Sequence, residues 1–176
     1  MSEFGFDSTA DEVLEGHDLG GRTVLVTGGY SGIGKETARA MAAKGAHVIL
    51  SGRDATKLAA AADGIAEETG AQVDTLVCDL ASLASVRGGA KEANERFGKI
   101  DLLINNGGVM ACPLARTADG FEMQFGTNHL GHFLLTNLLM PLIEKGEASR
   151  IVNLSSRGHH IDGVHFDDPN YERREY

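Results

Sequence analysis

The sequence lacks two features that are typical of nucleic-acid-binding and membrane proteins. It has no block of basic residues, and its 16 lysines and arginines are outnumbered by 25 aspartates and glutamates, for a net charge of −9. Because an acidic chain repels a phosphate backbone, we expect no nucleic-acid partner. The longest apolar stretch, residues 133–143, is interrupted by Thr136, Asn137 and Pro141. It is too short to cross a bilayer, so no membrane span is expected.

Cysteine is scarce, and the first residues include no apolar leader. The two cysteines, Cys78 and Cys112, lie in apolar segments and lack the paired spacing of a metal site. They are predicted to be buried, small hydrophobic residues in a reducing compartment. Since the N-terminus is acidic and has no hydrophobic core, no secretory signal is expected. These absences together predict a cytoplasmic protein.

What the sequence contains is typical of one globular domain. Its 176 residues are 42% hydrophobic and 23% charged, which is enough for one sizeable core. Residues 1–19 are predicted to form a tail and a short helix, in which Thr9 and Glu12 have the spacing of a capping box. Residues 20–176 are predicted to form the domain itself.

Apolar runs alternate with helical patterns along this domain. Strands are predicted at 23–26, 46–50, 72–78, 100–104 and 150–154, and helices at 32–44, 54–69, 82–97 and 121–143. The alternation predicts parallel strands with right-handed crossovers, hence an α/β, three-layer, doubly wound, Rossmann-like sheet of order 3-2-1-4-5. Ligands of such sheets bind at the carboxyl ends of the strands. The inner face of the first of these helices is predicted to carry Ile33, Thr37, Ala40 and Met41.

Residues 27–34, Thr-Gly-Gly-Tyr-Ser-Gly-Ile-Gly, join the first strand to the helix at 32–44. Gly28 can adopt backbone angles that a Cβ forbids. Gly32 has no side chain to keep a pyrophosphate from the backbone, and Gly34 lets the helix pack close to the strand. The helix N-terminus offers free N–H groups and a partial positive charge to phosphate. An ordinary glycine-rich turn is the alternative, but the position between strand and helix favours a dinucleotide site.

The spacing Thr-Gly-x-x-x-Gly-Ile-Gly resembles the cofactor loop of the short-chain dehydrogenase/reductase family. Residues 33–38, Ile-Gly-Lys-Glu-Thr-Ala, resemble its retinol-dehydrogenase-like branch, and the similarity extends from about residue 20 to residue 170. The resemblance implies an NAD(P)-dependent oxidoreductase that interconverts a carbonyl and a primary or secondary alcohol by hydride transfer. In the loop it implies cofactor contacts at Gly28, Tyr30, Ser31, Gly32, Ile33 and Gly34.

The end of the second strand indicates which cofactor is preferred. An NAD-selective site places a carboxylate there to bind the ribose 2′-hydroxyl. In the family alignment this position is Gly52, and the next residue, Arg53, can form a charge-assisted pair with a 2′-phosphate. NADP is therefore predicted in preference to NAD. The alternative is that Arg53 is a solvated loop charge and that Asp54 only caps the following helix.

Two further strand ends complete the implied cofactor site. After the third strand, Asp79 is implied to meet the edge of the adenine, and Leu80 to offer its backbone N–H beside it. After the fourth, Asn105 is implied to tie the sheet together along the cofactor. Gly107 occupies the place of an alanine in the family's Asn-Asn-Ala-Gly motif.

Two residues are implied to act in catalysis. Asn128 would kink the long helix and hold a water in the proton relay, with a buried structural amide as the alternative reading. Ser156 would bond the substrate carbonyl oxygen as charge develops there, with neighbouring Ser155 as the alternative. His129 and His132 are predicted to be packing or surface residues. No metal is expected, because the candidate ligands have no ligand-type spacing: His159, His160, Asp162, His165 and Asp167.

The family's proton donor is the tyrosine of a Tyr-x-x-x-Lys motif, and the sequence contains no such motif. Tyr30 lies in the glycine loop, Glu175 stands four residues after Tyr171, and Tyr176 is the last residue. We therefore expect a chain that stops before this motif and before the final strands of the sheet. Such a chain is expected to be inactive and marginally stable, so the alternative function is a dinucleotide-binding module without turnover.

The resemblance leaves the substrate and the assembly open. It implies a small apolar carbonyl or alcohol without naming one. Family members often dimerise through the long helix, so a homo-oligomer is compatible with the sequence. In the family, the helix that carries the missing motif packs beside the long helix at 121–143. Without it, we expect one face of the long helix, with Leu130, Leu134 and Leu138, to lie uncovered.

Overall fold

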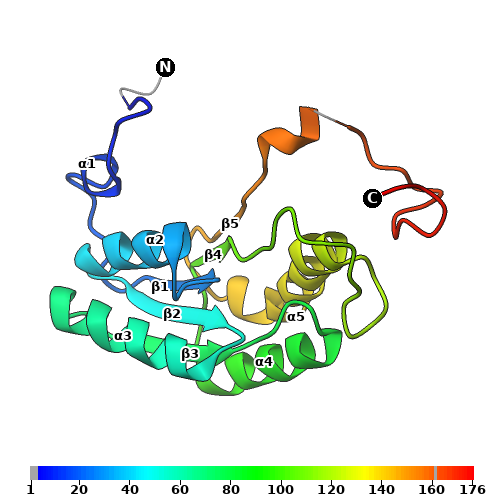
Figure 1. Ribbon diagram of the computed structural model, residues 1–176. Coiled ribbons are helices and arrows are strands. Elements are labelled where there is room, and N and C mark those ends of the chain that lie inside the picture. Colours follow the sequence, from blue (N-terminus) through cyan, green and yellow to red (C-terminus); the bar gives the residue numbers. More distant parts are fainter. Residues whose placement is uncertain (1–3, 161) are drawn as a thin grey trace.

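The computed structural model describes residues 4–160 and 162–176, and its centre is one parallel sheet (Figure 1). Its strands are β1 (Thr23–Thr27), β2 (His47–Gly52), β3 (Val73–Val77), β4 (Leu102–Asn105) and β5 (Arg150–Asn153). They are ordered β3-β2-β1-β4-β5, and all four neighbouring pairs are parallel. The predicted doubly wound, Rossmann-like α/β sheet is confirmed, with the predicted strand order.

Helices cover both faces of the sheet. In chain order they are α1 (Ala10–Val13), α2 (Gly32–Ala43), α3 (Ala55–Thr69), α4 (Leu83–Arg96), the π-helical η1 (Phe125–Gly131), α5 (His132–Ile143) and the 3₁₀-helical η2 (Arg157–His160). α2 and α3 pack together on one face, and α4 and α5 pack together on the other. Among the described residues, no helix combines the length and the apolar character needed to cross a membrane.

Two apolar cores follow from the two-residue period of the strands. In β1, Val24 and Val26 contribute to the core under α2 and α3, whereas Leu25 contributes to the core under α4 and α5. All three side chains are fully buried. A strand that is covered on both faces needs a continuous apolar run, which is why β1 reads Thr-Val-Leu-Val-Thr.

Local capping residues define where the helices begin. The Thr9 hydroxyl accepts a hydrogen bond from the Glu12 N–H and the Glu12 carboxylate accepts one from the Thr9 N–H, so the predicted capping box is present. Asp54 caps α3 by accepting from the Lys57 N–H, and Ser82 caps α4 by accepting from the Ser85 N–H. Each bond satisfies an N–H that has no partner within the helix.

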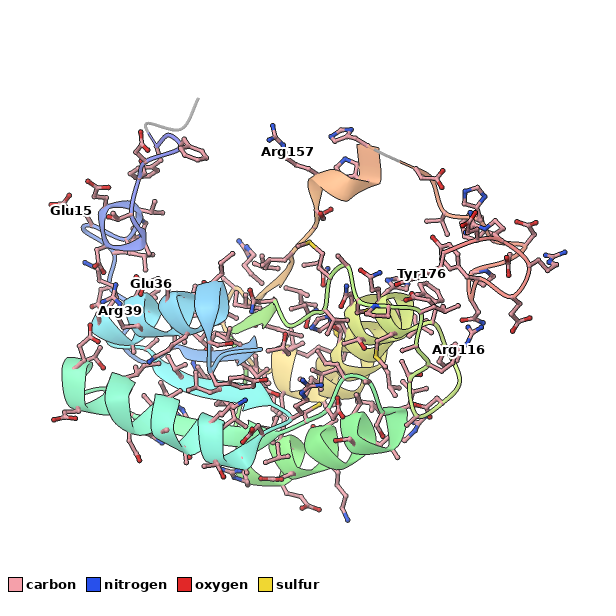
Figure 2. The ribbon with its side chains drawn as sticks, in the orientation of Figure 1. Glu15, Glu36, Arg39, Arg116, Arg157 and Tyr176 are labelled. Carbon is pink, nitrogen blue, oxygen red and sulfur yellow. The ribbon has the colours of Figure 1, made fainter. Side chains whose placement is uncertain are left out.

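The first residues of the described chain are attached to the domain through Arg39 of α2 (Figure 2). Its Nη2 lies 2.8 Å from Asp11 of α1 and 2.7 Å from Glu36, while its Nη1 lies 3.3 Å from Glu68 of α3. The short helix is thus held to two helices by one guanidinium. Met1, at the start of the predicted tail, lies outside the described residues.

Past β5 the chain leaves the sheet and then approaches the connection before η1 (Figure 1). The Glu122 N–H donates to the Asn170 side-chain oxygen at 2.9 Å, and the Tyr176 hydroxyl donates to the Glu122 carboxylate at 3.0 Å. Arg116 donates to the Asn170 carbonyl at 2.5 Å. The last described residues are therefore held by polar contacts rather than by the sheet.

Three predictions about burial were wrong. Ile33 is 73% exposed, and the buried residues of α2 are Gly34, Ala38, Ala40 and Ala42. The phase of the helix is set by Gly34, where an added Cβ would collide with the Gly28 carbonyl oxygen, so Ile33 points away from the sheet.

The other two concern α5 and the second cysteine. Leu134 and Leu138 pack against the core beneath α4, and it is Phe133, at 64% exposure, that faces solvent. The prediction failed because α4 already covers the leucine side of the helix. Cys78 is buried as predicted, but Cys112 is only half-buried.

Candidate cofactor and active site

The glycine loop between β1 and α2 is shaped by close backbone contacts. Gly28 has a φ of +64°, and an added Cβ would lie 2.9 Å from the Gly107 Cα atom. Gly32 has a φ of +53°. The Ser31 side chain makes no capping hydrogen bond to α2. The Gly29 N–H donates to the Ser51 carbonyl at 3.3 Å, but the N–H groups at the start of α2 are not used by the Ser31 side chain, and an added Cβ at Gly32 would meet nothing within 4 Å. This arrangement suits a diphosphate.

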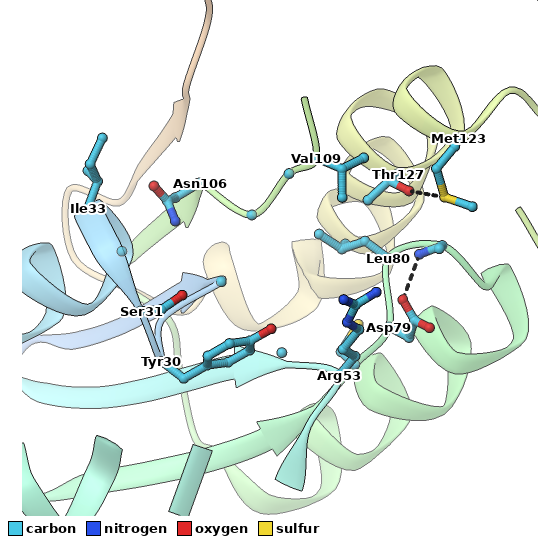
Figure 3. Close-up of a pocket in the computed structure, with 17 residues that line it drawn as sticks. Tyr30, Ser31, Ile33, Arg53, Asp79, Leu80, Asn106, Val109, Met123 and Thr127 are labelled. Carbon is cyan, nitrogen blue, oxygen red and sulfur yellow. Dashed lines mark hydrogen bonds between the residues drawn. The ribbon is translucent and has the colours of Figure 1, made fainter. Parts of the chain in front are cut away.

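One pocket lies at this end of the sheet, where the carboxyl ends of β1, β2, β3 and β4 meet (Figure 3). The predicted site residues that line it are Gly28, Tyr30, Ser31, Ile33, Gly34, Arg53, Asp79, Leu80 and Gly107. Gly52, which the resemblance puts at the ribose position, also lines it. The prediction missed the other lining residues: Cys78, Ala81, Asn106, Gly108, Val109, Met123 and Thr127. Gly32 belongs to the loop but does not line the pocket, and Asn105 lines a different hollow of the molecule.

Two charged residues border this pocket. Arg53 is exposed and makes no hydrogen bond or ion pair with any described residue. The neighbouring Asp54 carboxylate is engaged by Lys57 in capping α3. The Asp79 carboxylate accepts from the Ala81 N–H at 3.0 Å, which shapes the turn after β3. Arg53 is therefore the charge in this region that remains available to an anion.

Thr27, the last residue of β1, connects the glycine loop to the loop after β4. Its Oγ1 accepts hydrogen bonds from the Asn106 N–H at 2.9 Å and from the Gly107 N–H at 2.8 Å. The Asn106 amide also donates to the Thr27 carbonyl at 2.9 Å. One hydroxyl thus fixes two consecutive peptides that line the pocket.

The same hydroxyl lies 2.8 Å from Nε2 of His132, the first residue of α5. His132 Nδ1 lies 2.8 Å from the Asn128 carbonyl oxygen, which can only accept, so Nδ1 carries the proton and Nε2 accepts from Thr27. Burial lowers the pKa of His132, which favours this neutral form. His132 is a buried, fully bonded group, a role that its sequence context did not reveal.

Cys78 lies at the floor of the pocket. Its side chain is 2% exposed, and burial raises the pKa of its thiol to about 12. The group is therefore a neutral thiol at physiological pH.

The sequence model that describes short chain dehydrogenases matches residues 22–166. The chain belongs to the short-chain dehydrogenase family. Human retinol dehydrogenase 13 is 51% identical over 157 residues, which are 89% of this chain and 47% of that protein. The chain spans about half the length of the curated relatives that it matches. Their names place it in the retinol-dehydrogenase-like branch.

Solved structures that are similar to the chain agree with this family. The crystal structure of an uncharacterised protein from Mycobacterium paratuberculosis has a TM-score of 0.81 and 43% identity, covering 96% of this chain and 57% of that one. A short chain dehydrogenase from Escherichia coli CFT073, complexed with NADPH, has a TM-score of 0.66 and 33% identity. That match covers 76% of this chain and 57% of the other.

In this member of the family, Asn128 holds the loop after β4 against the long helix. Its Oδ1 accepts from the Val109 N–H and its Nδ2 donates to the Val109 carbonyl, both at 2.8 Å. Asn128 lies in the π-helical turn η1, so the helix is irregular where the family resemblance implies a kink. Its side chain is exposed rather than buried. The predicted proton-relay role remains a prediction.

Asn105 lies in a separate hollow between α5 and β5. Its Nδ2 donates to Thr136 Oγ1 at 3.0 Å and to Asn153 Oδ1 at 2.7 Å, which ties β4 to both elements. Its buried Oδ1 has no partner among the described residues. The same hollow is lined by Asn105, Asn128, His129, His132, Phe133, Thr136, Asn137, Asn153 and Leu154.

Ser156 lies beyond the end of β5. Its side chain is exposed, its Oγ accepts from the Gly158 N–H at 3.1 Å, and it lines neither the pocket nor the hollow. Ser156 therefore does not line the hollow that Asn128 lines, and its catalytic role remains a prediction. Within residues 4–160 and 162–176, no three His, Cys, Asp or Glu side chains form a group that could hold a metal ion.

Proposed function

We propose that this chain forms the cofactor-binding part of an NADP-dependent oxidoreductase that interconverts a carbonyl and an alcohol. The observation that carries the proposal is the unpaired Arg53 beside Gly52 at the end of β2, in the same pocket as the glycine loop. The neighbouring Asp54 carboxylate caps α3, so it is already bonded and is not placed as the carboxylate that would select NAD. The NADPH complex of the Escherichia coli short chain dehydrogenase supports this choice of cofactor.

The pocket residues would divide the cofactor among them. The glycine loop and the N-terminus of α2 would hold the diphosphate, Arg53 the 2′-phosphate, and Asp79 with Leu80 the adenine. The peptides at Asn106 and Gly107, fixed by Thr27, would border the nicotinamide half. A bound nicotinamide supplies the hydride for the carbonyl carbon.

The other half of the reaction is a proton for the carbonyl oxygen. In this family it comes from the Tyr-x-x-x-Lys pair, and residues 1–176 contain no such pair. We therefore expect a polypeptide of these residues to bind NADPH without turnover. Asn128 and Ser156 are proposed to act in the proton relay and at the substrate oxygen. An apolar carbonyl or alcohol is the proposed substrate class, which the similarity to retinol dehydrogenases supports.

The cofactor proposal is tested by titrating the chain with NADPH and NADH and following cofactor fluorescence. Arg53→Ala should weaken NADPH binding by about 10- to 100-fold and leave NADH unchanged, because a charge-assisted pair contributes about 1.5–3 kcal/mol. Lys91→Ala removes the same charge from an exposed site on α4 and should change neither affinity. Equal losses for NADPH and NADH in Arg53→Ala would contradict the assignment.

A further inference from the structure

The ring of Tyr30 occupies the space next to Gly52 that any side chain at position 52 would need. A Cβ added to Gly52 would lie 2.5 Å from Cε1 and 2.7 Å from Cδ1 of Tyr30. Real Cβ atoms do not approach other atoms so closely, so the ring would have to move. The third nearest atom, Leu58 Cδ2, lies at an ordinary 3.7 Å. Tyr30 is thus the obstacle.

Packing holds the ring in place. Tyr30 is half-buried and packs against the apolar core under α2 and α3. Its hydroxyl makes no hydrogen bond with any described residue. A ring held by contact area alone gives up that area when it is displaced. Figure 3 shows Tyr30 and Arg53 side chains directed to the same end of the pocket.

Position 52 is also where dinucleotide-binding sheets that prefer NAD carry a carboxylate for the ribose 2′-hydroxyl. With the Tyr30 ring where it lies, a side chain at position 52 has no room even for its Cβ. We propose that Tyr30 is a specificity-determining residue, whose ring keeps position 52 free of a side chain and so prevents an NAD-type ribose contact. This inference rests on the proposed function, because it concerns the ribose end of the same nicotinamide cofactor.

The test is a double-mutant cycle on affinity for NADH and NADPH, measured by fluorescence titration at one salt concentration. Gly52→Asp alone should bind both cofactors at least about tenfold more weakly than the unmodified chain, because the ring and the new carboxylate compete for space. Tyr30→Ala alone should keep its preference for NADPH. The variant that combines Gly52→Asp with Tyr30→Ala should bind NADH at least about tenfold more tightly than Gly52→Asp does, and its affinity for NADPH should stay low.

A matched control separates the ring from the hydroxyl. Tyr30→Phe combined with Gly52→Asp keeps the obstacle and should behave like Gly52→Asp alone. If Gly52→Asp by itself binds NADH as tightly as the combined Tyr30→Ala variant does, the ring is no obstacle and the proposal fails. If instead the unmodified chain binds neither cofactor, it is the proposed function that fails.

A smaller substitution covers the case in which Gly52→Asp does not fold. Gly52→Ala adds only the Cβ and should lower the thermal unfolding midpoint, and adding Tyr30→Ala should restore part of that loss. A Gly52→Ala chain with unchanged midpoint and unchanged NADPH affinity would overturn the steric argument. This readout needs no bound cofactor, so it separates the two proposals.

Discussion

Thr27 uses every hydrogen-bonding capacity of its hydroxyl: two N–H groups donate to it, and its own proton goes to His132. Thr27→Val keeps the shape but leaves the Asn106 and Gly107 N–H groups without that acceptor. We expect a loss of about 1–3 kcal/mol in the free energy of unfolding by urea. Thr27→Ser retains the hydroxyl and should lose less. Equal losses for the two variants would show that the methyl group matters instead.

His132 makes stability depend on pH. Burial lowers its pKa below the ordinary 6.5, so the unfolded chain takes up a proton before the folded chain does. Its contribution is present above pH 6.5 and is lost as the pH falls towards the lowered folded-state pKa. Protonated Nε2 no longer accepts from Thr27, whose proton then has only the Ile104 carbonyl, at 3.4 Å.

The check is urea unfolding at about pH 7.5 and about pH 5.5. His132→Asn should lose less stability between these values than the unmodified chain loses. His17→Asn, at an exposed position after α1 that is not in contact with His132, should lose as much as the unmodified chain. A pH dependence that persists unchanged in His132→Asn would contradict the assignment.

At the scale of single residues, the sequence predicts those residues whose conformation depends only on their neighbours in the chain. Gly28 is an example, since its positive φ follows from the turn itself. His132 is a counterexample, because nothing in a helical sequence tells which histidine will face the end of a strand. The sequence predicts Ile33 both as a cofactor contact and as part of the inner face of α2. Ile33 does line the pocket, but it points away from the sheet and not into the core.

At the scale of elements, Asn128 joins η1 to the loop at Val109. Asn128→Ala removes both hydrogen bonds to the Val109 backbone, so we expect faster hydrogen exchange at the Val109 amide and a loss of about 1 kcal/mol in stability. NADPH binding should weaken too, since Val109 lines the pocket. Asn137→Ala is the control, because Asn137 donates within its own helix to the Phe133 carbonyl. Unchanged exchange at Val109 would refute this role.

Element boundaries were predictable from the sequence because caps and glycines mark them locally. Ser82 and Asp54 each begin a helix at or within one residue of the predicted start. The π-helical turn was not predictable, since seven residues of apolar and polar pattern fit an α-helix equally well. The turn is in close tertiary contact with the loop after β4: an added Cβ at Gly108 would lie 2.9 Å from Asn128 Oδ1.

At the scale of the whole molecule, the pocket joins elements that are distant in sequence. Its lining comes from the ends of β1, β2, β3 and β4 and from the helix that begins near Met123. A ligand that bridges all of them stabilises only the folded state. NADPH at about 100 times its dissociation constant should raise the free energy of unfolding by about 2.7 kcal/mol.

This is measured as a rise in the thermal unfolding midpoint with NADPH concentration. At the same NADPH concentration, Arg53→Ala should show a smaller rise than Lys91→Ala, because its affinity is lower. A midpoint that does not respond to NADPH in a folded sample would contradict the cofactor site as a whole.

The strand order was predictable at this scale, whereas the exposed face of α5 at Phe133 was not, because it depends on which side α4 covers.

The neutral thiol of Cys78 makes the two cysteines chemically distinct. Alkylating reagents attack thiolates, and a buried thiol with a pKa of about 12 supplies almost none near pH 7. Cys112 is half-buried and does not line the cofactor pocket. A maleimide dye added to the native chain would therefore be directed to Cys112, which gives a single attachment point for an optical reporter that leaves the dinucleotide cleft unmodified.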